Sequence, residues 1–285
     1  MSDVPVREVL INGKWPLVLP EHRAQREEWA TGWEPERLDS MYANLRPGMV
    51  LYDIGTEEGD LSALFAKWVR GCTVVDCPCQ DGDSCNYEDV ALPDGELSEA
   101  MTRPDGWHRG GIVMVEPNPR VWPNIRVIWE ANDMPAPLWT LSGFVGDTDH
   151  LLERRDMGVP WPECAGGPVI GDHGFLNIKE SPFLPAVTVD TIAAQFATPP
   201  DAITMDIEGA EILAARGMQH TLAEHRPLVW VSVHAEAMFH DWGVYQAEFH
   251  SAFHQHGYEK QFLGFDHEQH WFYYPGERRD HVVLP

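Results

Sequence analysis

The sequence is poor in positive charge, in long apolar runs and in cysteine, and each shortage excludes a class of protein. Only 20 Lys and Arg face 45 Asp and Glu, which gives a formal net charge of −25 at pH 7. This charge disfavours nucleic acid or an anionic membrane as partner, because both bind through Lys and Arg. No apolar run reaches the length of a membrane span, and the first residues lack the basic start and apolar stretch of a signal peptide. We therefore expect a cytoplasmic protein.

The five cysteines do not form a disulfide framework in a cytoplasmic chain. Cys72, Cys77, Cys79 and Cys85 lie close together, but their spacing, C-x4-C-x-C-x5-C, matches no standard zinc module. A structural metal at this cluster remains an alternative to a site without one. The surrounding stretch, 72–110, is rich in Asp, Gly and Pro, and we interpret it as an irregular surface insertion.

The sequence also lacks a G-x-G-x-x-G fingerprint, and a different glycine turn organises the chain. Val50–Ile54 is a short apolar run of the kind found in buried parallel strands. Gly55 and Gly59 then mark a tight turn, and from Leu61 the apolar residues take helical spacing. Strand, glycine turn and helix form the entry to a Rossmann-like nucleotide site, with the ligand at the carboxyl end of the strand.

The charge of this turn indicates its ligand. The turn carries Asp53, Glu57, Glu58 and Asp60 and no Lys or Arg. A pyrophosphate would be repelled here, although a helix N-terminus by itself favours anions. A ligand with an adenosine end, a positive centre and no phosphate fits better, and S-adenosylmethionine is such a ligand. The alternative is a structural strand, turn and helix without a ligand.

Two further strands are expected to complete a nucleoside site. Gly111–Val115 is a second apolar run, and Glu116 after it can accept two hydrogen bonds from the ribose hydroxyls. A helix or an irregular crossover should follow, before a third strand over Leu138–Gly146. The end of that strand, Ser142 to Phe144, is a suitable place for the adenine.

Later in the chain, two strands end in residues that can do chemistry. The strand predicted over Ala202–Ile207 delivers Asp206 and Glu208, which point to opposite faces if the strand persists. A second strand, Leu228–His234, ends in a histidine. Because the strand ends of an open parallel sheet converge on the ligand crevice, His234 is placed to act as a base, or as a metal ligand with Asp206. A purely structural role for His234 remains the alternative.

The remaining segments predict a lead-in and a lid. Val9–Leu19 has two short apolar runs around Asn12-Gly13, a hairpin signal, and Glu34–Leu45 has the spacing of an amphipathic helix. We divide the chain into a lead-in, 1–46, and a main domain, 47–285. Within that domain, 147–186 has too many Pro and Gly for regular structure and is interpreted as a lid or substrate loop. A short helix capped by Thr188 or Asp190 should follow it.

Five of these segments together resemble the successive motifs of the FkbM-type S-adenosylmethionine-dependent methyltransferases. The resemblance runs from about residue 35 to the end of the chain and includes a closing β pair around Tyr258 and Trp271. The chain departs from the family at Thr56-Glu57, where Ala-Asn is usual, and by the insertion 72–110. The segments that carry it are Leu51–Asp60, Val115–Pro119, Val187–Ile192, Met205–Glu211 and Arg226–His234.

The resemblance implies a fold, a reaction and a set of site residues. The fold is α/β, a Rossmann-like class I methyltransferase with a mostly parallel seven-stranded sheet flanked by helices. The reaction is O-methylation of a hydroxyl on a sugar or small metabolite, so the expected substrate is a small molecule or a glycan. The expected cofactor-binding residues are Asp53, Gly55, Thr56, Glu57, Gly59, Glu116, Pro117, Asn118, Ser142, Gly143 and Phe144.

An oxygen nucleophile must lose its proton as it attacks, so a base or a metal is required. His234 is the first candidate base and Asp206 the second, with His173 available if the lid closes. A divalent metal such as Mg²⁺, held by Asp206, Glu208 and His234, is the competing device. Two other classes stay open: a non-catalytic Rossmann-like binding or adaptor module, and an NAD-dependent oxidoreductase.

Overall fold

A computed structural model describes residues 4–70, 110–151, 161–163, 176–196 and 198–285 of the chain. The cysteine cluster, His173 and nearly all of the predicted insertion lie outside these residues, as does part of the predicted lid.

The described chain is built on a seven-stranded sheet with the order β10-β11-β9-β8-β3-β4-β5. The strands from β5 to β9 pair in parallel, and β11 is antiparallel to both of its neighbours. This arrangement confirms the predicted fold class and the predicted closing β pair. The strands are β3 (Val50–Ile54), β4 (Gly111–Val115), β5 (Trp139–Leu141), β8 (Ala202–Met205), β9 (Leu228–Val233), β10 (Tyr258–Phe265) and β11 (Gln269–Pro275).

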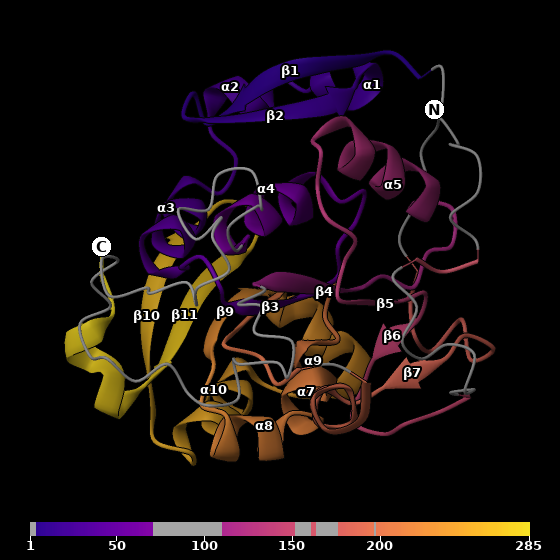
Figure 1. Ribbon diagram of the computed structural model, residues 1–285. Coiled ribbons are helices and arrows are strands. Elements are labelled where there is room, and N and C mark those ends of the chain that lie inside the picture. The colour runs from indigo at the N-terminus through magenta and orange to yellow at the C-terminus, as the bar shows by residue number, and fades with distance from the viewer. Residues whose placement is uncertain (1–3, 71–109, 152–160, 164–175, 197) are drawn as a thin grey trace, which may run out of the picture.

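Helices cover both faces of the sheet (Figure 1). On one face lie α3 (Pro35–Asn44), α4 (Asp60–Val69) and α5 (Trp122–Ala131). On the other lie α7 (Glu211–Arg216), α8 (Gln219–Glu224) and α10 (Gln246–His254), and α9 (Ala235–Trp242) follows the end of β9. A short helix, η5 (Gly276–His281), closes the chain. Among the described residues, no helix combines the length and the apolar composition that crossing a membrane requires.

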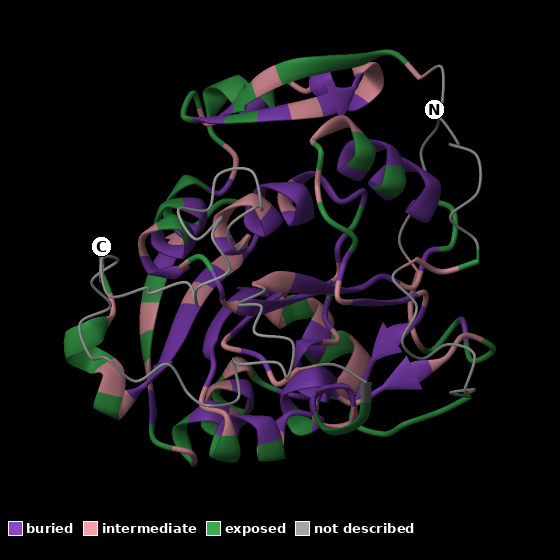
Figure 2. Cartoon of the chain, viewed as in Figure 1, coloured by how far each residue is buried: buried purple, intermediate pink, exposed green. Residues whose placement is uncertain are grey.

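Two apolar cores lie against the two faces of the sheet, and Figure 2 shows its central strands as almost continuously buried, whereas the edge strand β10 is partly exposed. The side chains of neighbouring residues in β3 point to opposite faces of the sheet, as they do in any β-strand. Leu51 packs with α3, α4 and α5, whereas Tyr52 packs with the helices of the other face. Every residue of β3 is buried, which explains why the sequence shows a mostly apolar run, interrupted only by Asp53, and not an alternating one.

The N-terminal hairpin is confirmed and packs on the outside of α4 and α5 (Figure 1). β1 (Val6–Ile11) and β2 (Trp15–Pro20) are antiparallel, and Asn12 and Gly13 both have the positive φ that a tight hairpin turn needs. The amide of Asn132, just after α5, bonds to both backbone groups of Val18, with distances of 2.9 and 2.7 Å. Two short helices, α1 (Glu21–Ala24) and α2 (Glu28–Thr31), lead from the hairpin to α3.

The predicted third strand is wrong in its extent, because it breaks into two pieces. β5 ends at Leu141, and β6 (Phe144–Val145) pairs instead with β7 (Ala186–Val187) in a separate two-stranded sheet. The Phe144 N–H donates to the carbonyl oxygen of Pro185 at 2.8 Å, which draws the chain out of the main sheet. After β7, Thr188 caps α6 (Val189–Thr191), one of the two predicted caps, and the chain continues as a π-helix, η4 (Ile192–Phe196).

Arg23 joins the N-terminal segment to the glycine turn. It is 3% exposed, and its Nε donates to Asp60 at 2.7 Å while its Nη1 donates to Glu58 at 3.2 Å. Both carboxylates are themselves buried. A buried ion pair adds little net stability, but removing one partner leaves the other charge buried without compensation.

We expect Arg23→Ala to destabilise the protein by about 3–5 kcal/mol, because two buried carboxylates lose their cation. Urea unfolding followed by circular dichroism measures this. The control is Lys14→Ala, which removes an exposed ion pair with Asp39 whose side chains are 52% and 51% exposed, and should cost less than about 1 kcal/mol. Equal losses from the two variants would contradict the structural role given to Arg23.

Candidate functional site

A cavity of about 680 Å³ opens at the carboxyl ends of β3, β4 and β8. This is the edge at which open α/β sheets bind their ligands. The glycine turn, the residues after β4, the residues after β8 and the N-terminal helices all contribute to its wall. The cavity is large enough for a nucleoside ligand together with a second small molecule.

The glycine turn is shaped by a close approach between two strand ends. Gly55 has a φ of +84°, and a Cβ built on it would lie 1.9 Å from the carbonyl oxygen of Asp206. No side chain fits there, so this position requires glycine both for its conformation and for its space. The turn therefore lies directly against the acidic segment that follows β8.

Asp53 lies at the bottom of the turn, 5% exposed, and accepts a hydrogen bond from the Ser62 hydroxyl at 2.5 Å. Burial raises the pKa of Asp53 to about 7, although the bond from Ser62 works in the opposite direction. A carboxyl that is about half protonated at neutral pH gains stability in its ionised form when a positive group binds next to it. Asp53, Gly55, Thr56 and Glu57 all line the cavity, although Gly59 does not.

Glu116 follows β4 and also lines the cavity. Its two oxygens accept backbone N–H bonds from Asn118 at 2.8 Å and from Glu57 at 3.1 Å. Burial nevertheless raises the pKa of Glu116 to about 8. The carboxyl thus lies beside the turn, where a pair of ribose hydroxyls can replace part of its lost hydration.

The other predicted cofactor residues are only partly gathered at the cavity. Pro117, Asn118, Gly143 and Phe144 line it, whereas Ser142 is not among the lining residues. The break between β5 and β6 explains the difference, because the chain leaves the main sheet at this point.

The charge of the turn is less one-sided than the sequence indicates. The side chain of Arg23 reaches Glu58 and Asp60 from α1, and Arg26 lies 3.5 Å from the Glu57 carboxylate. The turn itself contains no Lys or Arg, but two arginines from an earlier part of the chain accompany it. The side chains of Arg23, Arg26, Trp29 and Trp33 also line the cavity.

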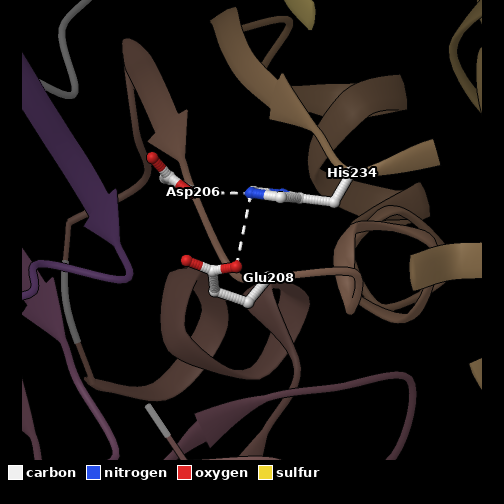
Figure 3. A group of neighbouring side chains, drawn as sticks. All are labelled: Asp206, Glu208 and His234. Atoms are coloured by element: carbon white, nitrogen blue, oxygen red, sulfur yellow. Dashed lines mark ion pairs between the residues drawn. The ribbon is translucent and has the colours of Figure 1, made fainter. Parts of the chain in front are cut away.

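The strand ends bring together the three residues proposed for catalysis or metal binding (Figure 3). β8 ends at Met205, so Asp206 and Glu208 lie in the turn that follows, and Glu208 has a φ of +53°. The prediction that these two side chains point to opposite faces therefore does not apply. The Nε2 of His234 lies 3.7 Å from Asp206 Oδ1 and 3.5 Å from Glu208 Oε2.

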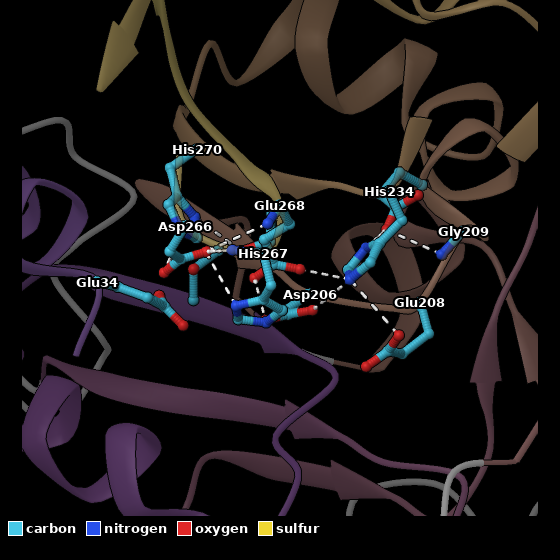
Figure 4. A network of polar contacts seen from close by, with 12 residues as sticks. Glu34, Asp206, Glu208, Gly209, His234, Asp266, His267, Glu268 and His270 are labelled. Atoms are coloured by element: carbon cyan, nitrogen blue, oxygen red, sulfur yellow. Dashed lines mark hydrogen bonds and ion pairs between the residues drawn. The ribbon is translucent and has the colours of Figure 1, made fainter. Parts of the chain in front are cut away.

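Two further carboxylates hold the ring of His234 (Figure 4). Glu211 Oε1 lies 2.7 Å from Nδ1, and Glu268, from the turn between β10 and β11, contacts Nε2. Burial works against a charged imidazole, but these contacts raise the pKa of His234 to about 11. In this ionisation state the ring carries its proton at neutral pH and cannot accept another.

Asp206 differs from His234 because it faces the cavity. Asp206 and Glu208 both line the cavity, whereas His234 is not among the lining residues. Burial raises the pKa of Asp206 well above its usual value, and the nearby Glu268 and Glu34 add to this effect. Arg37 acts against it from 3.9 Å.

Sequence reasoning missed four residues of this network. In the sequence, Glu34 and Arg37 belong to a segment predicted only as an amphipathic helix. In the structure, the Arg37 guanidinium donates hydrogen bonds to Glu34, to Thr204 on β8 and to Ser232 on β9. Glu268 gave no signal because it reaches His234 from a hairpin turn. Glu211 could have been noticed in the sequence because it belongs to the motif Met205–Glu211, but the motif does not show that its partner is His234.

Among known protein families, the one described as "Methyltransferase FkbM domain" matches residues 89–260, more than half of the chain. A search of curated proteins found no match.

Several solved structures are similar at low identity. A methyltransferase FkbM from Methylobacillus flagellatus KT has a TM-score of 0.46 and 14% identity, and the match covers 81% of this chain and 48% of that one. This chain therefore spans about half the length of that protein. A precorrin-6y C5,15-methyltransferase from Geobacter metallireducens GS-15 gives 0.41, 10% identity and coverages of 88% and 94%. Aeropyrum pernix fibrillarin, solved with natively bound S-adenosyl-L-methionine, gives 0.38, 11% identity and coverages of 96% and 100%.

The family match lies over the part of the chain that supplies β4, β8, β9 and the acidic turn after β8. The sheet order around these strands is that of the Rossmann-like class I methyltransferases. The chain belongs to the FkbM-type methyltransferase family.

Proposed function

We propose that this chain transfers the methyl group of S-adenosylmethionine to a hydroxyl oxygen of a sugar or another small metabolite. The observation that carries this proposal is the presence of two separate acidic groups in one cavity. Asp53 and Glu116 lie on the side of the glycine turn, and Asp206 and Glu208 lie on the side of β8. The first pair suits a cationic nucleoside, and the second suits a reaction that must remove a proton.

The cofactor's groups find matching partners on the glycine-turn side. The Glu116 carboxylate can accept bonds from two ribose hydroxyls. The positively charged ammonium and sulfonium groups would lie near the carboxylates of Asp53 and Glu57. Gly143 leaves space for the adenine, and the Phe144 ring offers it an apolar surface. No phosphate has to be placed among these carboxylates, which favours S-adenosylmethionine over NAD.

The reaction needs alignment and a proton acceptor. The bond from sulfur to the methyl carbon breaks with its electron pair on sulfur, while a bond from the acceptor oxygen to that carbon forms. The protein's main contribution is to hold oxygen, carbon and sulfur in line. Asp206 is the proposed acceptor of the hydroxyl proton, because it faces the cavity and its raised pKa makes its carboxylate a stronger base.

Aromatic rings support a sugar or similar acceptor. Trp33 and Trp242 are both partly exposed and line the cavity. An indole face offers apolar surface to the C–H groups of a saccharide ring while leaving its hydroxyls free. The N-terminal helix region and α9 would thus hold the acceptor between them.

We expect S-adenosylmethionine to bind in the micromolar range, measured by calorimetric titration, and Asp53→Ala to abolish this binding. NAD is the matched control ligand, because it shares the adenosine and replaces the cationic end by a pyrophosphate. NAD should not bind. Binding of NAD alone would favour an oxidoreductase, and binding of neither ligand would favour a non-catalytic module.

S-adenosylmethionine binding should release roughly one proton per site at pH 7. With pKa values of about 7 and about 8, Asp53 is about half protonated at pH 7 and Glu116 is largely protonated before the ligand binds. A cation beside Asp53 and hydroxyls on Glu116 favour the ionised forms. Because fewer protons are bound in the complex, affinity should rise between about pH 6 and pH 8. Titrations in phosphate and in Tris reveal the release as a difference in apparent enthalpy, which Glu116→Gln should reduce; equal enthalpies would contradict this assignment.

Asp206→Asn should lower turnover by about 10²–10⁴-fold while cofactor affinity stays nearly unchanged. The assay follows S-adenosylhomocysteine formation with a panel of sugars and small hydroxylated compounds. Asp39→Asn, which removes the same charge on the exposed side of α3, is the control and should keep wild-type turnover. Full turnover in Asp206→Asn would remove Asp206 as the base.

A further inference from the structure

The Nε2 atom of His234 faces three carboxylates that come from separate parts of the chain (Figure 4). Asp206 and Glu208 approach from the turn after β8 and Glu268 from the turn between β10 and β11. The donor atoms of Asp206, Glu208 and His234 all lie within 4.8 Å of one another, as do those of Glu34, Asp206 and Glu268. Asp206 is common to both sets, so it marks the centre of the cluster.

The spacing of Asp206 and Glu208 from Nε2 is that of ligands around an ion, whereas Glu268 lies closer, in direct contact with Nε2. Distances of 3.7 Å to Asp206 and 3.5 Å to Glu208 are too long for good hydrogen bonds from His234. Two ligands that each lie about 2.1 Å from one divalent ion are themselves separated by roughly 3.0–4.2 Å, depending on the geometry. Asp206 and Glu208 therefore lie at a metal-ligand separation from Nε2.

Glu268 gives further support, because its carboxylate is buried and depends on histidine rings for its counter-charge. Its side chain is 2% exposed, and its Oε2 lies in direct contact with Nε2 of His234, where the protonated ring can donate a hydrogen bond to it. Its contacts are ionic, with His234 and, at 3.7 Å, with His267. A carboxylate buried in this way costs free energy unless a cation compensates it.

Within the described part of the chain, the cations do not balance the cluster. Arg37 lies 3.9 Å from Asp206, and its guanidinium is shared with Glu34 and the hydroxyls of Thr204 and Ser232. One imidazole thus serves three carboxylates. On its other nitrogen, Nδ1, the same ring is held by buried Glu211 at 2.7 Å, an orientation typical of metal-binding histidines.

We propose that Asp206, Glu208, His234 and Glu268 bind one divalent cation at the wall of the cavity. The donors are three carboxylates and one imidazole, a mixed set that suits a transition ion such as Mn²⁺ better than Mg²⁺. Asp206 and Glu208 also line the cavity, so the ion lies within reach of the acceptor hydroxyl. There it lowers the pKa of that hydroxyl, and the second oxygen of the Asp206 carboxylate stays available for its proton.

The catalytic use of the ion rests on the proposed function, but ion binding itself does not. The experiment is therefore a Mn²⁺ titration of the full chain without S-adenosylmethionine, followed by the electron paramagnetic resonance signal of free Mn²⁺ and by calorimetry. We expect one Mn²⁺ per chain, displaced by Mg²⁺ only at a large excess. Absence of stoichiometric binding at millimolar Mn²⁺ would overturn the site.

Variants locate the ion. Glu268→Gln and Asp206→Asn should each weaken Mn²⁺ binding at least roughly tenfold, with thermal melting showing that each variant is folded. Glu57→Gln is the matched control, because it removes the same charge from the glycine turn of the same cavity, outside the proposed ligand set, and should leave Mn²⁺ affinity within about twofold. An equal loss in Glu57→Gln and Glu268→Gln would reduce the effect to general electrostatic attraction and overturn the assignment.

A separate titration with S-adenosylmethionine keeps the two proposals distinguishable. Mn²⁺ binding without cofactor binding would retain the metal site and remove the methyltransferase function. Cofactor binding without Mn²⁺ binding would retain the function, with Asp206 as its base, and remove the metal site.

Discussion

The close approach of Gly55 to the carbonyl oxygen of Asp206 fixes the geometry of the whole site. β3 and β8 are neighbouring parallel strands, and the Asp206 N–H continues their ladder by donating to Ile54 at 3.0 Å. Because Gly55 has no side chain, the glycine turn and the acidic turn after β8 stay in direct contact beyond the ends of their strands. The turn proposed for the cofactor and the carboxylates proposed for the acceptor therefore share one wall, so a methyl donor bound as proposed would lie beside the proposed proton acceptor.

The N-terminal segment completes this site instead of merely preceding it. Arg23 and Arg37 are each 3% exposed, and each compensates carboxylates that belong to the main domain. Arg23 holds the glycine turn from outside, while Arg37 crosses the sheet face to Thr204 and Ser232. Because their partners are buried, neither arginine can leave without exposing a charge imbalance in the core. The segment predicted as a lead-in, 1–46, thus has an electrostatic role that its sequence does not reveal.

Local patterns predicted most of the fold and the strand ends that border the candidate site. The hairpin at Asn12-Gly13, the strand before Gly55 and the strand ends at Asp206 and His234 follow from turn residues and apolar periodicity, which are properties of neighbouring residues. The break after Leu141 and the contact between His234 and Glu268 depend instead on segments brought together by folding. Charge in particular cannot be judged locally, as Arg23 shows by neutralising carboxylates of a turn that contains no cation of its own.

The two acidic groups of the cavity differ in how their buried carboxyls are stabilised: by protons near the glycine turn and by a histidine beyond β8. Near the glycine turn, Asp53 and Glu116 are buried, and burial raises the pKa of both carboxyls, so protons stabilise them until a ligand arrives. Beyond β8, burial alone would protonate the carboxylates as well, but the imidazolium of His234 keeps Glu268 ionised and lowers its pKa. A divalent cation offers these carboxylates more positive charge than one imidazolium does. It also requires the His234 ring to give up its proton and bind through the freed nitrogen, so proton and metal compete for the same atom. The acidity of this chain is therefore organised by where its counter-charges lie, and the cavity is the place where an incoming ligand can supply them.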